Sequence, residues 1–120
     1  MKIVQRPVVV FLHTDWCKYC QAMKQTTWKN KEVLDALEDY YFISFDGESK
    51  DPVEFLGKTF KYRPTGKKTG IHDIATQLGS IDGQVNYPTT VILSPNYEIL
   101  FQHNAYLPAK DMLTFLRKFK

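Results

Sequence analysis

The chain has 120 residues and a formal net charge of +3, and 43% of its residues are hydrophobic. This length suits one domain with an ordinary globular core and is too short for two. The mild charge does not by itself indicate a nucleic-acid binder, and no stretch approaches the roughly 20 apolar residues of a membrane span. We expect one monomeric domain over residues 1–120, with neither nucleic acid nor a membrane as a partner.

The first half of the chain alternates predicted strands and helices. Residues 8–12 form an apolar run typical of a buried strand. A helix is expected from about Trp16 to about Trp28, with Thr14 or Asp15 as its N-cap. An amphipathic helix and a second strand follow, over residues 31–39 and 41–45.

The middle of the chain is rich in turn-forming and basic residues. Asp51 and Pro52 are typical of a helix start, so a short helix is predicted through Leu56. Residues 57–70 contain five basic residues and no acidic one, and they are predicted to be a loop insertion. We interpret this segment as a solvated loop whose aromatic residues pack onto the domain; a recognition loop for an acidic or nucleic-acid partner is the alternative.

The last third predicts a helix, a hairpin and a further helix. The helix covers residues 71–78 and stops at Gly79. Two short strands flank a Ser-Pro-Asn turn, which favours an antiparallel hairpin, and the terminal helix begins near Pro108. The order of elements predicts an α/β fold with a parallel first pair of strands, a mixed four-stranded sheet and helices on both faces.

The two cysteines of the chain, Cys17 and Cys20, lie three positions apart at the junction of a strand and a helix. A disulfide framework would use more cysteines, and a zinc ribbon would need a second ligand pair. A purely structural disulfide is the alternative, although so short a loop gives little entropic stabilisation. We therefore predict a redox pair that uses neither a metal nor an organic cofactor.

The position of Cys17 favours a reactive thiolate. At the start of a helix, unpaired backbone N–H groups and the helix dipole stabilise negative charge on the sulfur, and Lys18 adds a positive charge nearby. We expect Cys17 to be exposed and to act as the nucleophile. Cys20, one turn deeper, would resolve the mixed disulfide.

Three stretches of the sequence resemble the thioredoxin superfamily. They are the apolar strand at residues 8–12, the motif Thr14-Asp15-Trp16-Cys17-Lys18-Tyr19-Cys20 and the element Tyr87-Pro88-Thr89-Thr90. The closest similarity is to bacterial thioredoxin-like proteins with a Trp-Cys-Lys-x-Cys site. The resemblance covers nearly the whole chain and implies a thioredoxin-like three-layer sandwich with a minimal N-terminus.

The resemblance also implies a substrate site around the cysteine pair. It places a cis peptide bond between Tyr87 and Pro88, beside Cys17, where the backbone pairs with an extended peptide. Trp16 would cover the disulfide. The implied substrate-binding residues are Trp16, Lys18, Tyr19, Tyr87 and Pro88.

The sequence departs from the superfamily beneath the site. Thioredoxins carry a buried Asp and a neighbouring Lys there, and the matching positions are Phe11 and Phe42. We expect a more apolar core, in which solvent or another base deprotonates Cys20. His13 and Asp15 are the nearest such bases in the sequence.

The resemblance implies a thiol–disulfide oxidoreductase that exchanges with protein substrates and with an unidentified redox partner protein. Its direction is open between reductase, oxidase and isomerase. A peptide-binding or chaperone-like module with a non-catalytic disulfide is the alternative function, and a glutathione-dependent or metal-sharing protein is less favoured. Similar bacterial proteins often carry leaders, which favours a periplasmic over a cytoplasmic location, although residues 1–7 are too short and too polar for a signal peptide.

Overall fold

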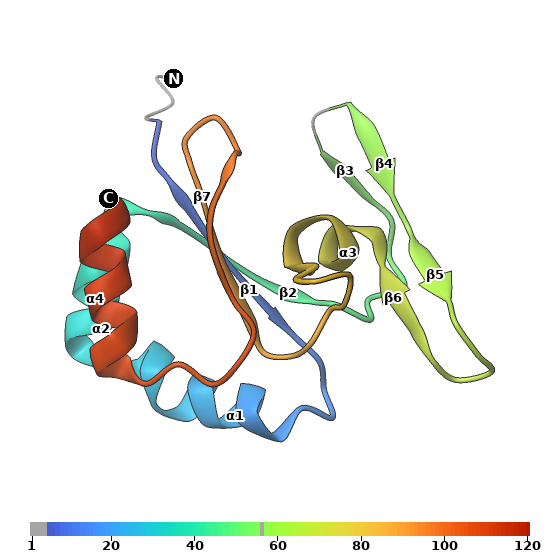
Figure 1. The fold of residues 1–120 in the computed structure, drawn as a ribbon, viewed down its shortest axis with the longest axis horizontal. Coiled ribbons are helices and arrows are strands. Elements are labelled where there is room, and N and C mark those ends of the chain that lie inside the picture. The colour runs from blue at the N-terminus through green and yellow to red at the C-terminus, as the bar shows by residue number, and fades with distance from the viewer. Residues whose placement is uncertain (1–4, 56) are drawn as a thin grey trace.

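The computed structural model describes residues 5–55 and 57–120, and a four-stranded sheet forms its centre (Figure 1). The strand order is β2-β1-β7-β8, with β1 Val8–His13, β2 Tyr41–Asp46, β7 Thr89–Leu93 and β8 Ile99–His103. The pair β1 and β2 is parallel, and the other neighbouring pairs are antiparallel. This topology confirms the predicted mixed sheet, its parallel first pair and the hairpin near the C-terminus.

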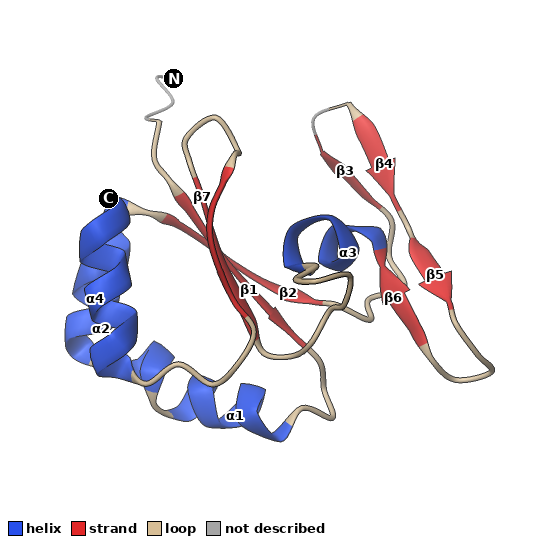
Figure 2. Ribbon diagram, viewed as in Figure 1, coloured by secondary structure: helices blue, strands red, loops and turns tan. Residues whose placement is uncertain are grey.

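Helices cover both faces of the sheet, as expected (Figure 2). One face carries α1 Lys18–Gln25, α2 Lys31–Ala36 and α4 Ala109–Phe119, together with the 3-10 turns η1 Thr27–Lys29 and η2 Leu37–Asp39. The opposite face carries α3 Asp73–Gly79. Within the described ranges, no helix is long and apolar enough to span a bilayer.

Strand β1 lies between the two apolar layers of the core. Val9 and Phe11 point toward α1, α2 and α4, whereas Val8, Val10 and Leu12 point toward α3. Successive side chains of a strand face opposite sides, so a strand covered on both faces needs an uninterrupted apolar run. This requirement explains the sequence of β1, whose end also fixes the position of the cysteine pair.

Two predicted helix starts are wrong by a few residues. The N-cap of α1 is Cys17, not Thr14 or Asp15, because the Cys17 sulfur itself accepts the hydrogen bond from the backbone N–H of Cys20. Helix α3 begins at Asp73, because the residues before it pair in a strand and the buried His72 side chain provides the N-cap.

The predicted short helix from Asp51 through Leu56 is also wrong. Val53–Phe55 form strand β3, and Leu56 lies outside the described residues. Val53 and Phe55 alternate with Glu54, which is the period of a strand, and the Phe55 ring packs edge-on against Tyr97 at 5.2 Å. This tertiary contact overrides the local helix-start signal.

The predicted basic loop at residues 57–70 is instead built from strands. Two antiparallel hairpins project from the side of the domain that carries α3 (Figure 1). One joins β3 to β4 Lys58–Phe60, and the other joins β5 Tyr62–Pro64 to β6 Gly70–His72.

Candidate active site

The cysteine pair lies at the C-terminal end of β1, where the chain enters α1. Cys17 and Cys20 form a disulfide, with their Cα atoms 5.2 Å apart. Cys17 is the N-cap, its sulfur accepts from the Cys20 amide at 3.1 Å, and its carbonyl accepts from Gln21. The Cys17 sulfur therefore faces the unpaired N–H groups of the helix start, where negative charge is stabilised.

The expected exposure of Cys17 is wrong for the disulfide form. Cys17 is 4% exposed and Cys20 is fully buried, and both belong to the core cluster against which Tyr87 packs. The order of burial agrees with the prediction that Cys20 lies deeper. The accessible part of the disulfide is thus a small part of Cys17 at the rim of the core.

Exposed side chains surround this rim. Trp16 and Tyr19 are 68% and 64% exposed, and Lys18 is exposed between the two cysteines. The Trp16 ring meets the Tyr87 ring edge-on at a centroid distance of 6.0 Å. The structure thus brings Trp16 and Tyr87 together, while Tyr19 points into solvent.

Tyr87 and Pro88 come from the loop before β7, and the peptide bond between them is cis. The Tyr87 ring lies directly over Gly47, where an added Cβ would stand 2.2 Å from the phenol oxygen. Only glycine leaves room for this contact. Burial, followed by the charges of Glu48 and Asp46, raises the pKa of Tyr87 to about 12.

The loop after β2 completes the site, and sequence reasoning did not identify it. Glu48 accepts a hydrogen bond from the Trp16 indole at 2.8 Å, and Gly47 donates from its amide to the His13 carbonyl at 2.8 Å. Parallel neighbouring strands end at the same edge of a sheet. Because β2 was expected beside β1, its end at Asp46 was a signal that could have led to Gly47 and Glu48.

Aromatic rings fill the core beneath the disulfide. Trp28 contacts Phe11 at 5.4 Å and Phe42 at 4.8 Å between ring centroids. These are the two positions at which the sequence departs from the superfamily, and one indole joins them. No buried carboxylate with a lysine partner stands there, because its place is occupied by these rings.

Of the two bases nearest in sequence, His13 is the one for which a polar partner is seen. It stacks on Phe11 at 5.5 Å, and its Nδ1 lies 3.4 Å from the Lys24 ammonium. Burial and then Lys24 lower its pKa below 6.5, while Asp46 and Asp15 act in the opposite direction. Its imidazole is therefore neutral at pH 7 and able to accept a proton.

The described residues offer no metal site, and their apolar groove lies apart from the disulfide. No cluster of three or more His, Cys, Asp or Glu side chains that could hold a metal ion occurs in residues 5–55 and 57–120. An apolar groove runs between β2 and α3, lined by side chains such as Ile43, Val53 and Leu78. It contains none of the residues around the disulfide.

Comparison with known proteins gives a consistent result. Residues 1–95 match the family described as Thioredoxin-like, and no curated protein matches the sequence.

Several solved structures share the fold at low sequence identity. A thioredoxin from Thermus thermophilus superposes with a TM-score of 0.64 at 21% identity, covering 94% of this chain and 72% of that one. A thioredoxin-fold protein from Helicobacter pylori gives 0.63 at 17% identity, covering 94% and 68%. The reduced C-terminal domain of DsbD from Neisseria meningitidis gives 0.59 at 15% identity, covering 97% and 83%.

Proposed function

Because this chain belongs to the thioredoxin-like family, we propose that it is a thiol–disulfide oxidoreductase acting on protein disulfides. The observation that carries the proposal is the Cys17–Cys20 disulfide at the N-terminus of α1, with the Cys17 sulfur facing the helix amides. The fold and the close cysteine pair support redox chemistry. We further propose the roles of the individual residues and a protein disulfide as the substrate.

The helix start would supply the reactive species. When the disulfide is reduced, the Cys20 amide that lies 3.1 Å from the Cys17 sulfur can donate to a thiolate there. Such a hydrogen bond and the helix dipole lower the pKa of a cysteine at this position. Because the thiolate is the attacking species, this placement raises the reactive fraction at neutral pH.

The exchange proceeds in two steps. The Cys17 thiolate attacks one sulfur of a substrate disulfide, forms a mixed disulfide and releases a substrate thiolate, which takes up a proton. Cys20 then loses its proton to a base and attacks the Cys17 sulfur, releasing the second substrate thiolate. Two electrons pass to the substrate, and an external dithiol must reduce the Cys17–Cys20 disulfide again. Each step is reversible, so the potential of the pair sets the direction.

The rim around Cys17 would bind the substrate. Trp16 and Tyr87 are in contact and frame the accessible edge of Cys17. We infer that an extended peptide lies along the backbone before Pro88, beside these two rings. Lys18 and Tyr19, exposed beside the disulfide, would meet the residues that flank the substrate cysteine.

Trapping tests the two cysteine roles. A reduced Cys20→Ser variant is expected to accumulate mixed disulfides with a protein substrate that carries disulfides, because nothing resolves them. A Cys17→Ser variant is expected to form none. Mixed disulfides that form only in Cys17→Ser would reverse the assignment, and their absence from both variants would reject it.

The low exposure of Cys17 favours one alternative, a peptide-binding module whose disulfide is structural. Reduction of insulin by dithiothreitol separates the two functions. The proposed enzyme accelerates the reaction and Cys17→Ser does not, whereas a binding module accelerates it in neither form. Equilibration with glutathione then gives the direction, since a potential below about −250 mV suits a reductase and one near −120 mV suits an oxidant.

A further inference from the structure

The basic residues of this protein are concentrated on one projecting part of the chain. We call residues 57–70, which run from β4 through β5 to the start of β6, the basic arm. It holds five of the 16 basic residues and none of the 13 acidic ones, so the rest of the chain has 11 basic and 13 acidic residues, a net charge of −2. The positive net charge of the protein therefore comes from the arm.

The arm exposes its charged side chains, whereas its aromatic rings are half-buried. All five of its basic side chains are exposed, whereas Phe60 and Tyr62 are half-buried. The Tyr62 ring lies over Gly70, where an added Cβ would stand 2.1 Å from the ring. The arm thus combines the two interpretations of its sequence: its aromatic residues pack inward, and its cations face solvent.

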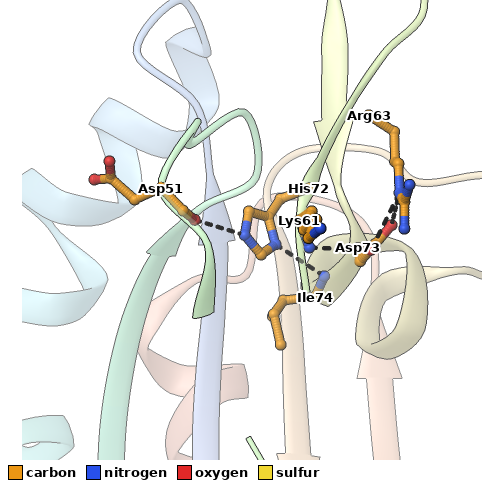
Figure 3. Close-up of polar contacts among 6 residues, drawn as sticks. All are labelled: Asp51, Lys61, Arg63, His72, Asp73 and Ile74. Atoms are coloured by element: carbon orange, nitrogen blue, oxygen red, sulfur yellow. Dashed lines mark hydrogen bonds and ion pairs between the residues drawn. The ribbon is translucent and has the colours of Figure 1, made fainter. Parts of the chain in front are cut away.

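The arm is fixed to the helix that follows it by the contacts in Figure 3. Asp73 accepts from the Lys61 amide at 3.0 Å and from the Arg63 guanidinium at 3.0 Å. His72 donates from Nε2 to the Asp51 carbonyl at 2.9 Å, and its Nδ1 accepts from the Ile74 amide at 3.1 Å. These bonds hold the hairpin in a defined direction, even though its turn is in solvent.

The same anchor connects the arm to the candidate active site. The His72 amide donates to the Gly47 carbonyl at 2.8 Å, and the next residue, Glu48, holds Trp16. In Figure 1, the turn between β5 and β6 lies at the same end of the molecule as the segment that leads from β1 into α1. A substrate bound at Cys17 would therefore have the cations of the arm to one side.

We propose that the basic arm binds an acidic segment of the protein whose disulfide reacts at Cys17, an inference that rests on the proposed function. Arg63 is paired with Asp73, and the four lysines of the arm leave a local excess of positive charge that attracts an acidic partner and raises its association rate. The inward packing of Phe60 and Tyr62 favours a polypeptide over a single-stranded nucleic acid, because the latter is bound by stacking on exposed rings. Lys67 and Lys68 are exposed in the turn between β5 and β6, and we propose that they make this contact.

Rates of peptide reduction test the arm separately from the chemistry. The reduced protein is mixed with two dye-labelled peptide disulfides that share one core and carry either acidic or uncharged flanks. The variant is Lys67→Glu/Lys68→Glu, and the control with the same charge change is Lys31→Glu/Lys110→Glu, at exposed positions on α2 and α4. Circular dichroism checks that each variant is folded.

The wild-type protein and the control are expected to reduce the acidic peptide about tenfold faster than the uncharged one at about 10 mM salt, and nearly equally at about 1 M salt. Lys67→Glu/Lys68→Glu is expected to lose this preference. Equal rates in the wild type, or an unchanged preference in the arm variant, would overturn the inference while leaving the oxidoreductase function standing. If neither peptide disulfide is reduced and the oxidised protein does not oxidise the corresponding dithiol peptides, the proposed function fails and the inference with it. Another outcome is that the wild type reduces both peptides at equal rates and binds an oligonucleotide that only the arm variant fails to bind. That result would assign the arm to nucleic acid.

Discussion

The Trp16 indole donates a hydrogen bond to the Glu48 carboxylate, 2.8 Å away and 32 residues later in the chain. Trp16 precedes the cysteine pair, and Glu48 follows β2, the strand parallel to β1. The bond therefore joins the ends of two neighbouring strands across the candidate active site. It also holds the Trp16 ring against Tyr87, although the indole is largely exposed.

A Glu48→Ala substitution tests this bond. We expect slower reduction of protein disulfides, by about fivefold, because an exposed hydrogen bond to a charged group contributes about 1 kcal/mol and Trp16 would no longer be held at the rim. Tryptophan fluorescence should shift as the indole loses its acceptor. Glu54→Ala, at an exposed position on β3, is the control and should change neither signal. A Glu48→Ala enzyme with the wild-type rate and emission would show that the bond does not position Trp16.

Much of the fold could be predicted because its signals are local and mutually consistent. The apolar run of β1, the cysteine pair after it and the Ser-Pro-Asn turn each define one element, and their order defines the sheet. The start of α1 was misplaced because the N-cap is Cys17, whose sulfur is not an ordinary capping group. The exposure of Cys17 was also mispredicted, since Cys17 belongs to a core cluster to which distant segments contribute, among them Tyr87.

The residues that sequence reasoning missed depend on long-range contacts. Gly47 and Glu48 follow β2 and belong to no recognisable motif. They take part in the site because the end of β1 lies beside them. Strand β3 exists because Phe55 packs on Tyr97, a contact that the Asp51-Pro52 signal does not predict. The sequence shows that Phe11 and Phe42 replace two partnered polar residues of the superfamily. It does not show that the Trp28 ring contacts both of them.

Phe11 and Phe42 both contact Trp28, but their different burial predicts a large difference between the two alanine substitutions. Phe11 is 1% exposed and Phe42 is 41% exposed. Phe11→Ala should lower the free energy of unfolding by about 3–5 kcal/mol, because it leaves a cavity in the core. Phe42→Ala should cost clearly less, since solvent already reaches that ring. Urea unfolding with unchanged m-values measures both. Equal losses would mean that Phe11 does not support the core beneath the disulfide.

The buried phenols of Tyr87 and Tyr40 predict a loss of stability in alkali. Burial is the main cause that raises the pKa of each to about 12, above the value of about 10 in an unfolded chain. The neutral phenol is therefore favoured by folding. The contribution of this phenol to the free energy of unfolding is complete below pH 10 and is lost as the pH rises from 10 to 12. Unfolding by urea across this range should show a smaller decline in Tyr87→Phe, and a smaller one still when Tyr40→Phe is added. A decline that Tyr87→Phe leaves unchanged would contradict the burial of this group.

The two side-chain bonds of His72 predict a graded series of substitutions. His72 is fully buried, caps α3 through Ile74 and donates to the Asp51 carbonyl. His72→Ala removes both bonds and leaves a cavity, so it should lower the free energy of unfolding by about 2–4 kcal/mol. His72→Asn keeps an acceptor suited to the N-cap and should fall between Ala and the wild type.

His103→Ala provides the matched control, because His103 is half-buried on β8 and stacks on Phe101 at 6.3 Å. It should cost less than His72→Ala. The two histidines should also differ in their effect on the basic arm, since the His72 side chain bonds to the Asp51 carbonyl and to the Ile74 amide at the base of the arm. Trypsin cleavage after Lys67 or Lys68 should therefore accelerate in His72→Ala and not in His103→Ala. If His72→Ala resists trypsin as the wild type does, the arm is held by the Arg63–Asp73 ion pair and the strand pairing alone, and an anchoring role of the His72 side chain would be rejected.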